Sequence, residues 1–168
     1  MALKDSMRRS PRITRMVFNL WPCIRGTGGR VTHIAPDWSE LRLKLPLNWR
    51  TRNYVGTIFG GSLYSAVDPF LMLMLIERLG RDYVVWDKSA SIRFRKPGTS
   101  TLHATFTVDD AEVADLRAAV DAAGSLDRTW QVDLVDSEGV VHASVEKVLY
   151  IATKDADRAR RARREATT

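Results

Sequence analysis

The sequence of 168 residues has little of the chemistry from which disulfides and metal sites are built. It contains one cysteine, Cys23, which excludes an internal disulfide framework, and neither a Cys-x-x-Cys pair nor a Cys/His cluster suggests a zinc site. We therefore expect no metal and no cofactor. A chain without disulfides is typical of a reducing compartment, so we expect a cytoplasmic protein.

The sequence also lacks a long hydrophobic run. Its most apolar segment, residues 57–80, has only seven consecutive apolar residues, 70–76, whereas a helix needs about 20 to span a bilayer. An earlier apolar stretch, residues 16–24, is broken by Asn19 and Pro22 and has no cleavage pattern of a secretory signal. We expect no membrane span and no secretory signal, and we interpret the 57–80 segment as a buried helix.

The positive charge of the chain lies at its two ends. The formal net charge is +6 at pH 7; residues 1–30 carry seven Lys or Arg against one Asp, and residues 154–168 carry six against three acids. The segment between them has 13 positive and 16 negative side chains. Because a nucleic-acid-binding domain places a basic stripe on a folded face, we expect no nucleic-acid partner and interpret the ends as solvated tails. Attraction of these tails to nucleic acid or to an acidic membrane stays open as an alternative.

The spacing of apolar residues divides the chain into three parts. Residues 1–29 combine an amphipathic helix, with apolar residues at i, i+3, i+4 and i+7 from Ile13, and a glycine-rich connector. Residues 30–153 form the main domain, and residues 154–168 form a basic C-terminal tail. In the main domain, period-two alternation predicts strands at residues 31–35, 38–47, 83–86, 89–96, 101–108, 129–136 and 140–152.

Two helices interrupt these strands. The segment 109–124 predicts a surface helix that Asp109 caps and Gly124 ends. The segment 57–79 is apolar on all sides, so it is the one element against which a sheet with one apolar face can bury that face. We expect an α+β fold in which a curved antiparallel sheet wraps around this helix, with Ala90, Ile92 and Phe94 pointing inward.

One acid stands inside the apolar helix. Asp68 follows the Gly60-Gly61 pair by two turns and precedes Pro69. Apolar surroundings would disfavour its ionised form and make its carboxylate a strong base, suited to activating water or attacking a carbonyl. Pro69 cannot donate an amide hydrogen bond and can kink the helix, which would aim Asp68 towards a cleft. The alternative is a structural acid at the kink, bonded to nearby backbone or to Lys88.

Residues 53–68, NYVGTIFGGSLYSAVD, resemble the signature of the hotdog-fold acyl-CoA thioesterases, especially their phenylacetyl-CoA thioesterase-like branch. In that signature an Asn and a Gly precede His-Gly-Gly at the start of the central helix, and an acid follows two turns later. Here Asn53 lies six residues before Phe59, and Asp68 lies eight residues after Gly60. The phrases FNLWPC, NYVGTIFGGSLY and VWDKSA also resemble a second hotdog subgroup, described only as thioesterase candidates. The resemblance implies a hotdog fold over residues 30–152.

The resemblance also implies an activity, the hydrolysis of a thioester of coenzyme A or of an acyl carrier protein. Asp68 would act as base or nucleophile, Asn53 would position water or substrate, and the Gly60 amide would hold the developing oxyanion. The glycine pair suits this role because its bare amides lie at the positive end of a helix dipole; removal of one such donor costs on the order of 3 kcal/mol of barrier. In family members the acid acts on substrate bound against the partner subunit, so the resemblance implies a homodimer or a tetramer.

Two positions depart from the signature. Phe59 stands where the family has His, which removes a ring nitrogen that could orient substrate; Phe59 and Gly61 remain expected substrate contacts. This departure also argues against the hydratase relatives, which use that His as a proton shuttle. Asp87 falls where some relatives have a Ser that assists catalysis. We expect Asp87 either to form a polar pair with Lys88 near the acid or to make an exposed salt bridge.

Basic residues follow on the same predicted strand. Arg93 and Arg95, with Lys96, are suited to receive the phosphates of coenzyme A, and a solvated sheet face is the alternative. We expect the three histidines, His33, His103 and His142, at the surface, because each alternates with outward polar residues.

Two other functions stay open beside thioester hydrolysis. One is a non-catalytic acyl- or lipid-binding hotdog protein that lost the His, and the other is an interaction protein that uses its basic tails.

Overall fold

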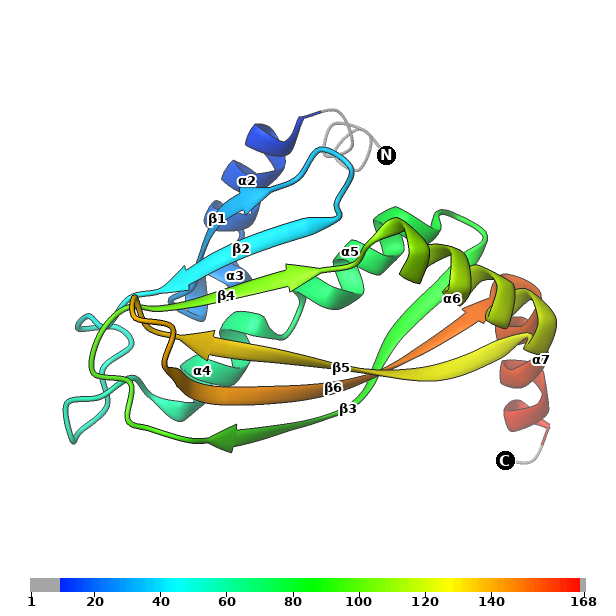
Figure 1. Ribbon diagram of the computed structural model, residues 1–168. Coiled ribbons are helices and arrows are strands. Elements are labelled where there is room, and N and C mark those ends of the chain that lie inside the picture. The colour runs from blue at the N-terminus through cyan, green and yellow to red at the C-terminus, as the bar shows by residue number, and fades with distance from the viewer. Residues whose placement is uncertain (1–9, 167–168) are drawn as a thin grey trace.

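The computed structural model describes residues 10–166, so residues 1–9 of the expected N-terminal part and residues 167–168 of the expected tail lie outside the described residues. Six strands form one antiparallel sheet in the order β1-β2-β4-β5-β6-β3 (Figure 1). The strands are β1 (Arg30–Ile34), β2 (Glu40–Leu45), β3 (Tyr83–Phe94), β4 (Leu102–Thr107), β5 (Ser125–Val135) and β6 (Val141–Thr153). The helices are α2 (Pro11–Leu20), α3 (Pro22–Gly26), α4 (Gly60–Val67), α5 (Phe70–Leu79), α6 (Asp110–Ala123) and α7 (Lys154–Glu165).

The sheet curves around α4 and α5, as Figure 1 shows, so the expected α+β fold with a sheet around an apolar helix is confirmed. The helix expected over residues 57–79 is interrupted at Asp68 and Pro69, where the ring nitrogen of proline has no hydrogen to donate. Alternate residues of the strands and most of the apolar side chains of α4 and α5 form one continuous core. The largest fully buried core side chains include Leu41, Leu43, Phe70, Met74, Phe106 and Leu134.

The predicted surface helix is confirmed as α6. Its N-cap is Asp109, whose carboxylate accepts a hydrogen bond from the Glu112 amide at 2.7 Å, and its C-cap is Gly124 with φ of 78°. Val113, Leu116 and Val120 form its buried face. None of the helices among residues 10–166 is long and apolar enough to cross a membrane.

Strand β3 is an edge strand and is the least buried part of the sheet. The two strands predicted at residues 83–86 and 89–96 are one strand with a register shift between Asp87 and Ser89. Ala90, Ile92 and Phe94 lie opposite Lys147, Val145 and Ala143 of β6, which are buried, so their predicted inward direction is confirmed. Ala90 and Phe94 are nevertheless exposed, because nothing in the described chain covers this edge.

Helices also cover both ends of the main domain. In α2, within the expected amphipathic segment, Asn19 accepts a hydrogen bond from the Val31 amide and donates one to the Val31 carbonyl, at 2.8 and 2.9 Å. At the other end, α7 lies beside β6 and β3 (Figure 1). Residues 154–165 are therefore helical, whereas we expected a solvated tail. Thr153 caps α7 by accepting a bond from the Ala156 amide, and acids occupy its first turn, where they complement the helix dipole.

Candidate active site

Asp68 lies at the C-terminal end of α4 in polar surroundings. Its Oδ1 accepts a hydrogen bond from the Tyr64 hydroxyl at 2.7 Å and one from Lys147 Nζ at 2.9 Å. Lys147 Nζ also donates to the main-chain carbonyl of Asp68. The side chain of Asp68 is 41% exposed, and within residues 10–166 no hydrogen bond involves its Oδ2. The expected apolar environment of Asp68 is thus wrong, because a cation from β6 reaches it through the core.

Lys147 is the residue that the sequence analysis missed. It is 0% exposed and lies on the inward face of β6, between the buried side chains of Val145 and Leu149. Its Nζ is 2.9 Å from an oxygen of Asp68 and 2.8 Å from an oxygen of Asp87. A buried ammonium without partners would cost several kcal/mol, and here two carboxylates and a carbonyl compensate it. We call Asp68, Asp87 and Lys147, with Tyr64, the carboxylate–lysine cluster.

A signal in the sequence could have found Lys147. In the alternating stretch of β6, the positions of Val145, Lys147 and Leu149 all point to the same face. A lysine at an inward position of a central strand needs a buried anionic partner, and Asp68 in the apolar helix needs a cation. Each of the two polar residues is unexpected alone, and together they explain one another.

Tyr64 is the neutral donor of the cluster. Burial, with the hydrogen bond to Asp68 and the nearby negative charges of Asp68 and Asp87 as further causes, raises the pKa of Tyr64 to about 12. The hydroxyl is therefore protonated at neutral pH and keeps donating to Asp68. Because Tyr64 and Asp68 lie one turn apart, the helix itself places this contact.

Asp87 joins the cluster by a different pairing from the one expected. The predicted Asp87–Lys88 pair is wrong, because Asp87 bonds Lys147, whereas Lys88 bonds Asp127 of β5. The register shift between Asp87 and Ser89 interrupts the strand at Lys88, so Asp87 reaches Lys147 of β6 whereas Lys88 reaches Asp127 of β5. Asp87 does lie near Asp68, as expected, because Lys147 contacts the carboxylates of both residues. The suggested bond between Asp68 and Lys88 is absent from the described contacts of Lys88.

The glycine pair begins α4, as expected, and aromatic rings lie over it. No residue in the described range accepts a hydrogen bond from the amides of Gly60 or Gly61. A Cβ at Gly61 would be 2.3 Å from the ring of Phe59, and one at Gly60 would be 3.1 Å from the ring of Phe94. The ring of Phe59 thus leaves no room for a side chain at Gly61, whereas at Gly60 the exposed ring of Phe94 would have to shift by only a few tenths of an ångström. Phe59 itself is exposed, and its amide donates to the Thr51 carbonyl at 2.7 Å.

Asn53 closes the loop before α4. Its Oδ1 accepts a hydrogen bond from the Thr57 amide at 3.0 Å, and its Nδ2 donates to Thr57 Oγ1 at 2.9 Å. Gly56 in this loop has φ of 89°, a conformation that favours glycine. The described contacts of Asn53 stay within residues 53–57, so the structure does not join its side chain to Asp68 in one chain.

Gly60 and Asp68 are also separated within one chain. They lie at opposite ends of α4, eight residues apart, which corresponds to about 12 Å along the helix axis. Arg93 and Arg95 are exposed, and the cross-strand partner of Arg93, Ser144, belongs to the face opposite Lys147. The structure thus brings Asp68 and Asp87 together, and it leaves Gly60, Asn53 and the two arginines apart from them.

His142 is buried, contrary to expectation. Its Nδ1 lies 2.8 Å from the Pro97 carbonyl and its Nε2 lies 3.0 Å from Asp136 Oδ2. The hydrogen bond with His142 lowers the pKa of Asp136. His33 and His103 are exposed, as expected. Among residues 10–166 no three His, Cys, Asp or Glu side chains are grouped so as to hold a metal ion.

The fold is shared with solved bacterial structures of low sequence identity. A Pseudomonas aeruginosa protein of unknown function, described as a probable thioesterase, has a TM-score of 0.74 at 17% identity and matches over 84% of this chain and 95% of its own. A Chlorobaculum tepidum protein of unknown function has a TM-score of 0.67 at 15% identity, over 89% and 96%. A Haemophilus influenzae thioesterase has a TM-score of 0.63 at 12% identity, over 86% and 91%. The chain therefore has the hotdog fold that its sequence predicted.

Among curated proteins, none matches the chain. A family model does match residues 9–151, and the chain belongs to that family, DUF4442, a domain of unknown function. The resemblance to the hotdog superfamily is thus confirmed at the level of fold, and the phenylacetyl-CoA thioesterase-like branch stays a prediction.

Proposed function

We propose that the protein hydrolyses an acyl thioester carried by coenzyme A or by an acyl carrier protein, with Asp68 as the reacting acid. The observation that carries this proposal is the fixed, half-exposed carboxylate of Asp68, with two donors on Oδ1 and no described partner on Oδ2. Similarity of fold to a Haemophilus influenzae thioesterase supports it. Oδ2, without a hydrogen bond in the described residues, leaves Asp68 able to accept a proton, while Oδ1 holds the side chain in place.

The cluster suits general base catalysis. Oδ2 of Asp68 would take a proton from water as the water oxygen attacks the thioester carbonyl carbon. The carbon–sulfur bond then breaks, and the leaving thiolate receives that proton from Asp68. Lys147 and Tyr64 hold the carboxylate in one orientation, and Lys147 balances the charges of Asp68 and Asp87. Direct attack of Asp68 on the carbonyl uses the same arrangement and differs in forming an acyl intermediate.

The oxyanion donor of this site would come from a second copy of the chain. The Gly60 amide lies about 12 Å along the helix from Asp68 and cannot reach the same carbonyl within one chain. We propose a homodimer, alone or paired into a tetramer, in which Gly60 of each copy faces Asp68 of the other. Asn53, at the loop that leads to Gly60, would position substrate or water from that second copy.

The uncovered edge of the sheet supports a dimer. Strand β3 has 12 residues and no neighbour on its outer side in the described chain, and long open edges are normally paired or covered. Large exposed apolar side chains occur on β3 and in the loop before α4; they are Trp49, Tyr54, Val55, Phe59, Trp86 and Phe94. Pairing of two β3 strands would cover the edge and part of this apolar surface.

The other predicted substrate contacts follow from this arrangement. Phe59, over Gly61, provides an apolar wall for an acyl chain, and Asp87 fixes Lys147 beneath the carboxylate. Arg93 and Arg95 are exposed on or just beyond β3 and would meet phosphates outside the cleft. A cytoplasmic location fits a substrate of this class.

A second candidate is a non-catalytic acyl-binding protein. The observation that favours it is the ring of Phe59, which covers Gly61 and offers no nitrogen for proton transfer. In this case the carboxylate–lysine cluster would serve only the stability of the fold.

A thiol-release assay over short, long and aromatic acyl-CoAs separates the two candidates, with wild type compared with Asp68→Asn. We expect turnover by the wild type and a loss of at least 100-fold in the variant. Absence of turnover on every acyl-CoA and acyl carrier substrate, or equal rates in the two proteins, would show the mechanism to be wrong. A bound acyl chain without turnover would favour the binding protein. A monomer in light scattering would exclude the shared site.

A further inference from the structure

A pocket lies between α7 and strand β3, apart from the inward face that carries Asp68. Its volume is about 400 Å3, and its lining residues are Trp86, Arg160, Arg161, Arg164 and Glu165. A second hollow of about 700 Å3 adjoins it and shares Trp86, Arg160 and Arg164. Together we call them the α7 pocket. Both hollows are open to solvent, so a ligand would lie against this surface and not inside a closed cavity.

One buried acid holds Arg160 and Arg161 of the α7 pocket in place. Asp157 is 4% exposed, and its two carboxylate oxygens bond Arg160 at 3.0 Å and Arg161 at 2.8 Å. The guanidinium of Arg160 also lies 4.5 Å from the ring centre of Tyr150. Two of the three arginines are therefore ordered before any ligand arrives, which lowers the entropy cost of binding.

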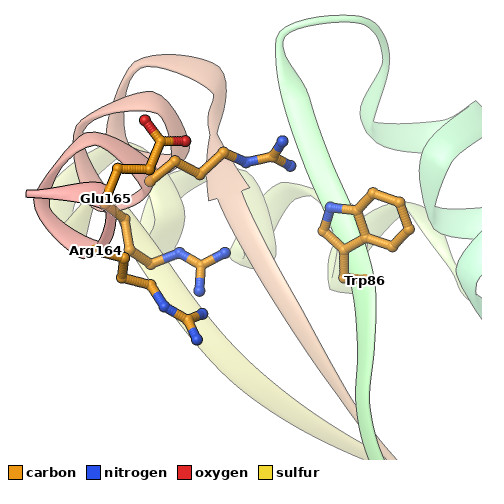
Figure 2. A pocket seen from close by; sticks show the side chains of 5 residues that line it. Trp86, Arg164 and Glu165 are labelled. Carbon is orange, nitrogen blue, oxygen red and sulfur yellow. The ribbon is translucent and has the colours of Figure 1, made fainter. Parts of the chain in front are cut away.

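Trp86 forms the opposite wall. Figure 2 shows its indole on β3 facing Arg164 and Glu165 of α7 across the pocket. The side chain is an exposed aromatic surface on an edge strand, 52% accessible. A flat π surface opposite guanidinium groups suits a ligand that joins a planar ring to an anion, because the ring stacks on the aromatic face and arginine binds phosphate.

We propose that the α7 pocket binds a phosphorylated purine nucleotide. The base lies against Trp86, and the phosphates are bound by Arg161 and Arg164. Three arginines and one acid, Glu165, line the smaller hollow, and Asp157 pairs with two of these arginines, so this end of the pocket keeps a small net positive charge.

The layout of charge favours a compact ligand over an extended polyanion. The larger hollow has two acids, Asp87 and Asp127, beside Lys88, Arg160 and Arg164. Because Asp127 pairs with Lys88, the side of this hollow away from α7 has no excess of positive charge. A nucleic acid or an anionic membrane lying across both hollows would meet these acids, whereas a nucleotide can keep its phosphates at the α7 end.

Coenzyme A and free adenine nucleotides share this chemistry. Asp87 lines the larger hollow and also bonds Lys147, so the α7 pocket adjoins the carboxylate–lysine cluster. Nucleotide binding goes beyond the proposed hydrolysis and does not depend on it, since it is measured without a thioester.

The test is isothermal titration of the full chain with adenosine 3′,5′-diphosphate, which is the nucleotide part of coenzyme A. Coenzyme A, ATP and inorganic phosphate are titrated in parallel. We expect saturable nucleotide binding that weakens at least tenfold in Trp86→Ala and in Arg164→Ala. The matched controls are Trp49→Ala, another exposed tryptophan, and Arg158→Ala, an α7 arginine that does not line the pocket; both should bind as wild type does. Circular dichroism melting checks that each variant is folded.

The outcomes separate the possible ligands. Tighter binding of coenzyme A and adenosine 3′,5′-diphosphate than of ATP would identify coenzyme A as the source and would assign its phosphates to Arg161 and Arg164 instead of Arg93 and Arg95. The reverse would identify a free nucleotide. The proposal fails if no nucleotide binds at millimolar concentration, if the Trp86 and Arg164 variants bind like wild type, or if inorganic phosphate binds as tightly as the nucleotides. Retention only on duplex DNA or on vesicles of anionic lipid would also overturn it. A thioesterase assay that fails while nucleotide binding holds would reject only the hydrolysis.

Discussion

The carboxylate–lysine cluster and the α7 cluster of Asp157, Arg160 and Arg161 have the same layout with the signs of the charges exchanged. In the first, one buried cation, Lys147, bonds two half-exposed carboxylates. In the second, one buried carboxylate, Asp157, bonds two half-exposed guanidinium groups. In both cases the single buried charge is the fixed partner, and the two outer groups keep atoms available to solvent.

The difference lies in what the outer groups can do. Carboxylate oxygens that face solvent can accept a proton from water, whereas guanidinium groups that face solvent can bind an anion. The inner charge lies in the core in the first cluster and on the buried side of α7 in the second. Removal of each inner charge should therefore have different costs, and substitution of an outer group should affect function more than stability.

The largest expected effect is on catalysis, from an outer group. Asp68→Asn keeps the shape of the side chain and removes its ability to take a proton, so we expect kcat to fall by about 10²–10⁴-fold. The thiol-release assay measures this change. Glu40→Gln is the matched control, because Glu40 is another partly exposed acid bonded to a cation, Arg42, and lies outside the carboxylate–lysine cluster and the α7 pocket; it should leave kcat unchanged. An equal loss of kcat in both variants would show that Asp68 has no special role in catalysis.

The next effect is on stability, from the inner cation. Lys147→Met keeps much of the volume and leaves Asp68 and Asp87 without a cation, so we expect the free energy of unfolding to fall by about 2–4 kcal/mol. The loss is at the lower end for a buried pair because both carboxylates are partly exposed. Urea unfolding at pH 7 gives the value, and Lys88→Met, which breaks an exposed pair, should cost less than about 1 kcal/mol. Similar costs for the two lysines would contradict the buried role of Lys147.

The inner carboxylate of α7 should matter less. Asp157→Asn leaves Arg160 and Arg161 without their anion, yet both guanidinium groups can be hydrated, since they are 42% and 57% exposed. We expect a loss of about 1–2 kcal/mol, which includes one acid removed from the first helical turn. Asp155→Asn on the exposed side of the same turn is the control and should cost less. A larger cost for Asp157→Asn than for Lys147→Met would reverse the ranking of the two clusters.

The sequence predicts the elements of this fold well because their signals are local. Alternation located the strands, Asp109 and Gly124 bounded α6, and Pro69 marked the interruption between α4 and α5. The start of α7 was also readable, from Thr153 followed by acids, yet its charged composition suggested a solvated tail. In α7 a contact that joins the helix to the sheet is the guanidinium of Arg160 over the ring of Tyr150 on β6, and the sequence pattern does not show it.

The site was less predictable because its contacts are long-range. Asp68 and Lys147 are 79 positions apart, and only the register of β6 against the helix brings them together. The predicted Asp87–Lys88 pair was wrong because each residue has a partner on another strand, Lys147 of β6 for Asp87 and Asp127 of β5 for Lys88. His142 was assigned to the surface by alternation, but Pro97 and Asp136 from two loops cover it. The alternation of apolar and polar residues predicts to which face of the sheet a side chain points. It does not predict which loops or helices cover that face.

The smallest expected effect is on stability at alkaline pH, and it comes from Tyr64, the neutral hydrogen-bond donor of the carboxylate–lysine cluster. Because the pKa of Tyr64 is raised to about 12 in the folded protein, whereas a tyrosine in the unfolded chain titrates near 10, its contribution to stability is complete below pH 10. As the pH rises from 10 towards 12, the unfolded chain loses this proton while the folded chain keeps it. The free energy of unfolding should therefore fall over that range.

Tyr64→Phe should remove this part of the alkaline decline. Unfolding in urea at pH 9, 10, 11 and 11.5 measures the decline in wild type, in Tyr64→Phe and in Tyr54→Phe, whose hydroxyl is fully exposed. Tyr83, whose pKa is also raised by burial and by its bond to Asp121, remains in all three proteins, so the difference between variants isolates Tyr64. A curve for Tyr64→Phe that is parallel to wild type would mean that the hydroxyl does not hold Asp68, and the orientation of that carboxylate would then rest on Lys147 alone.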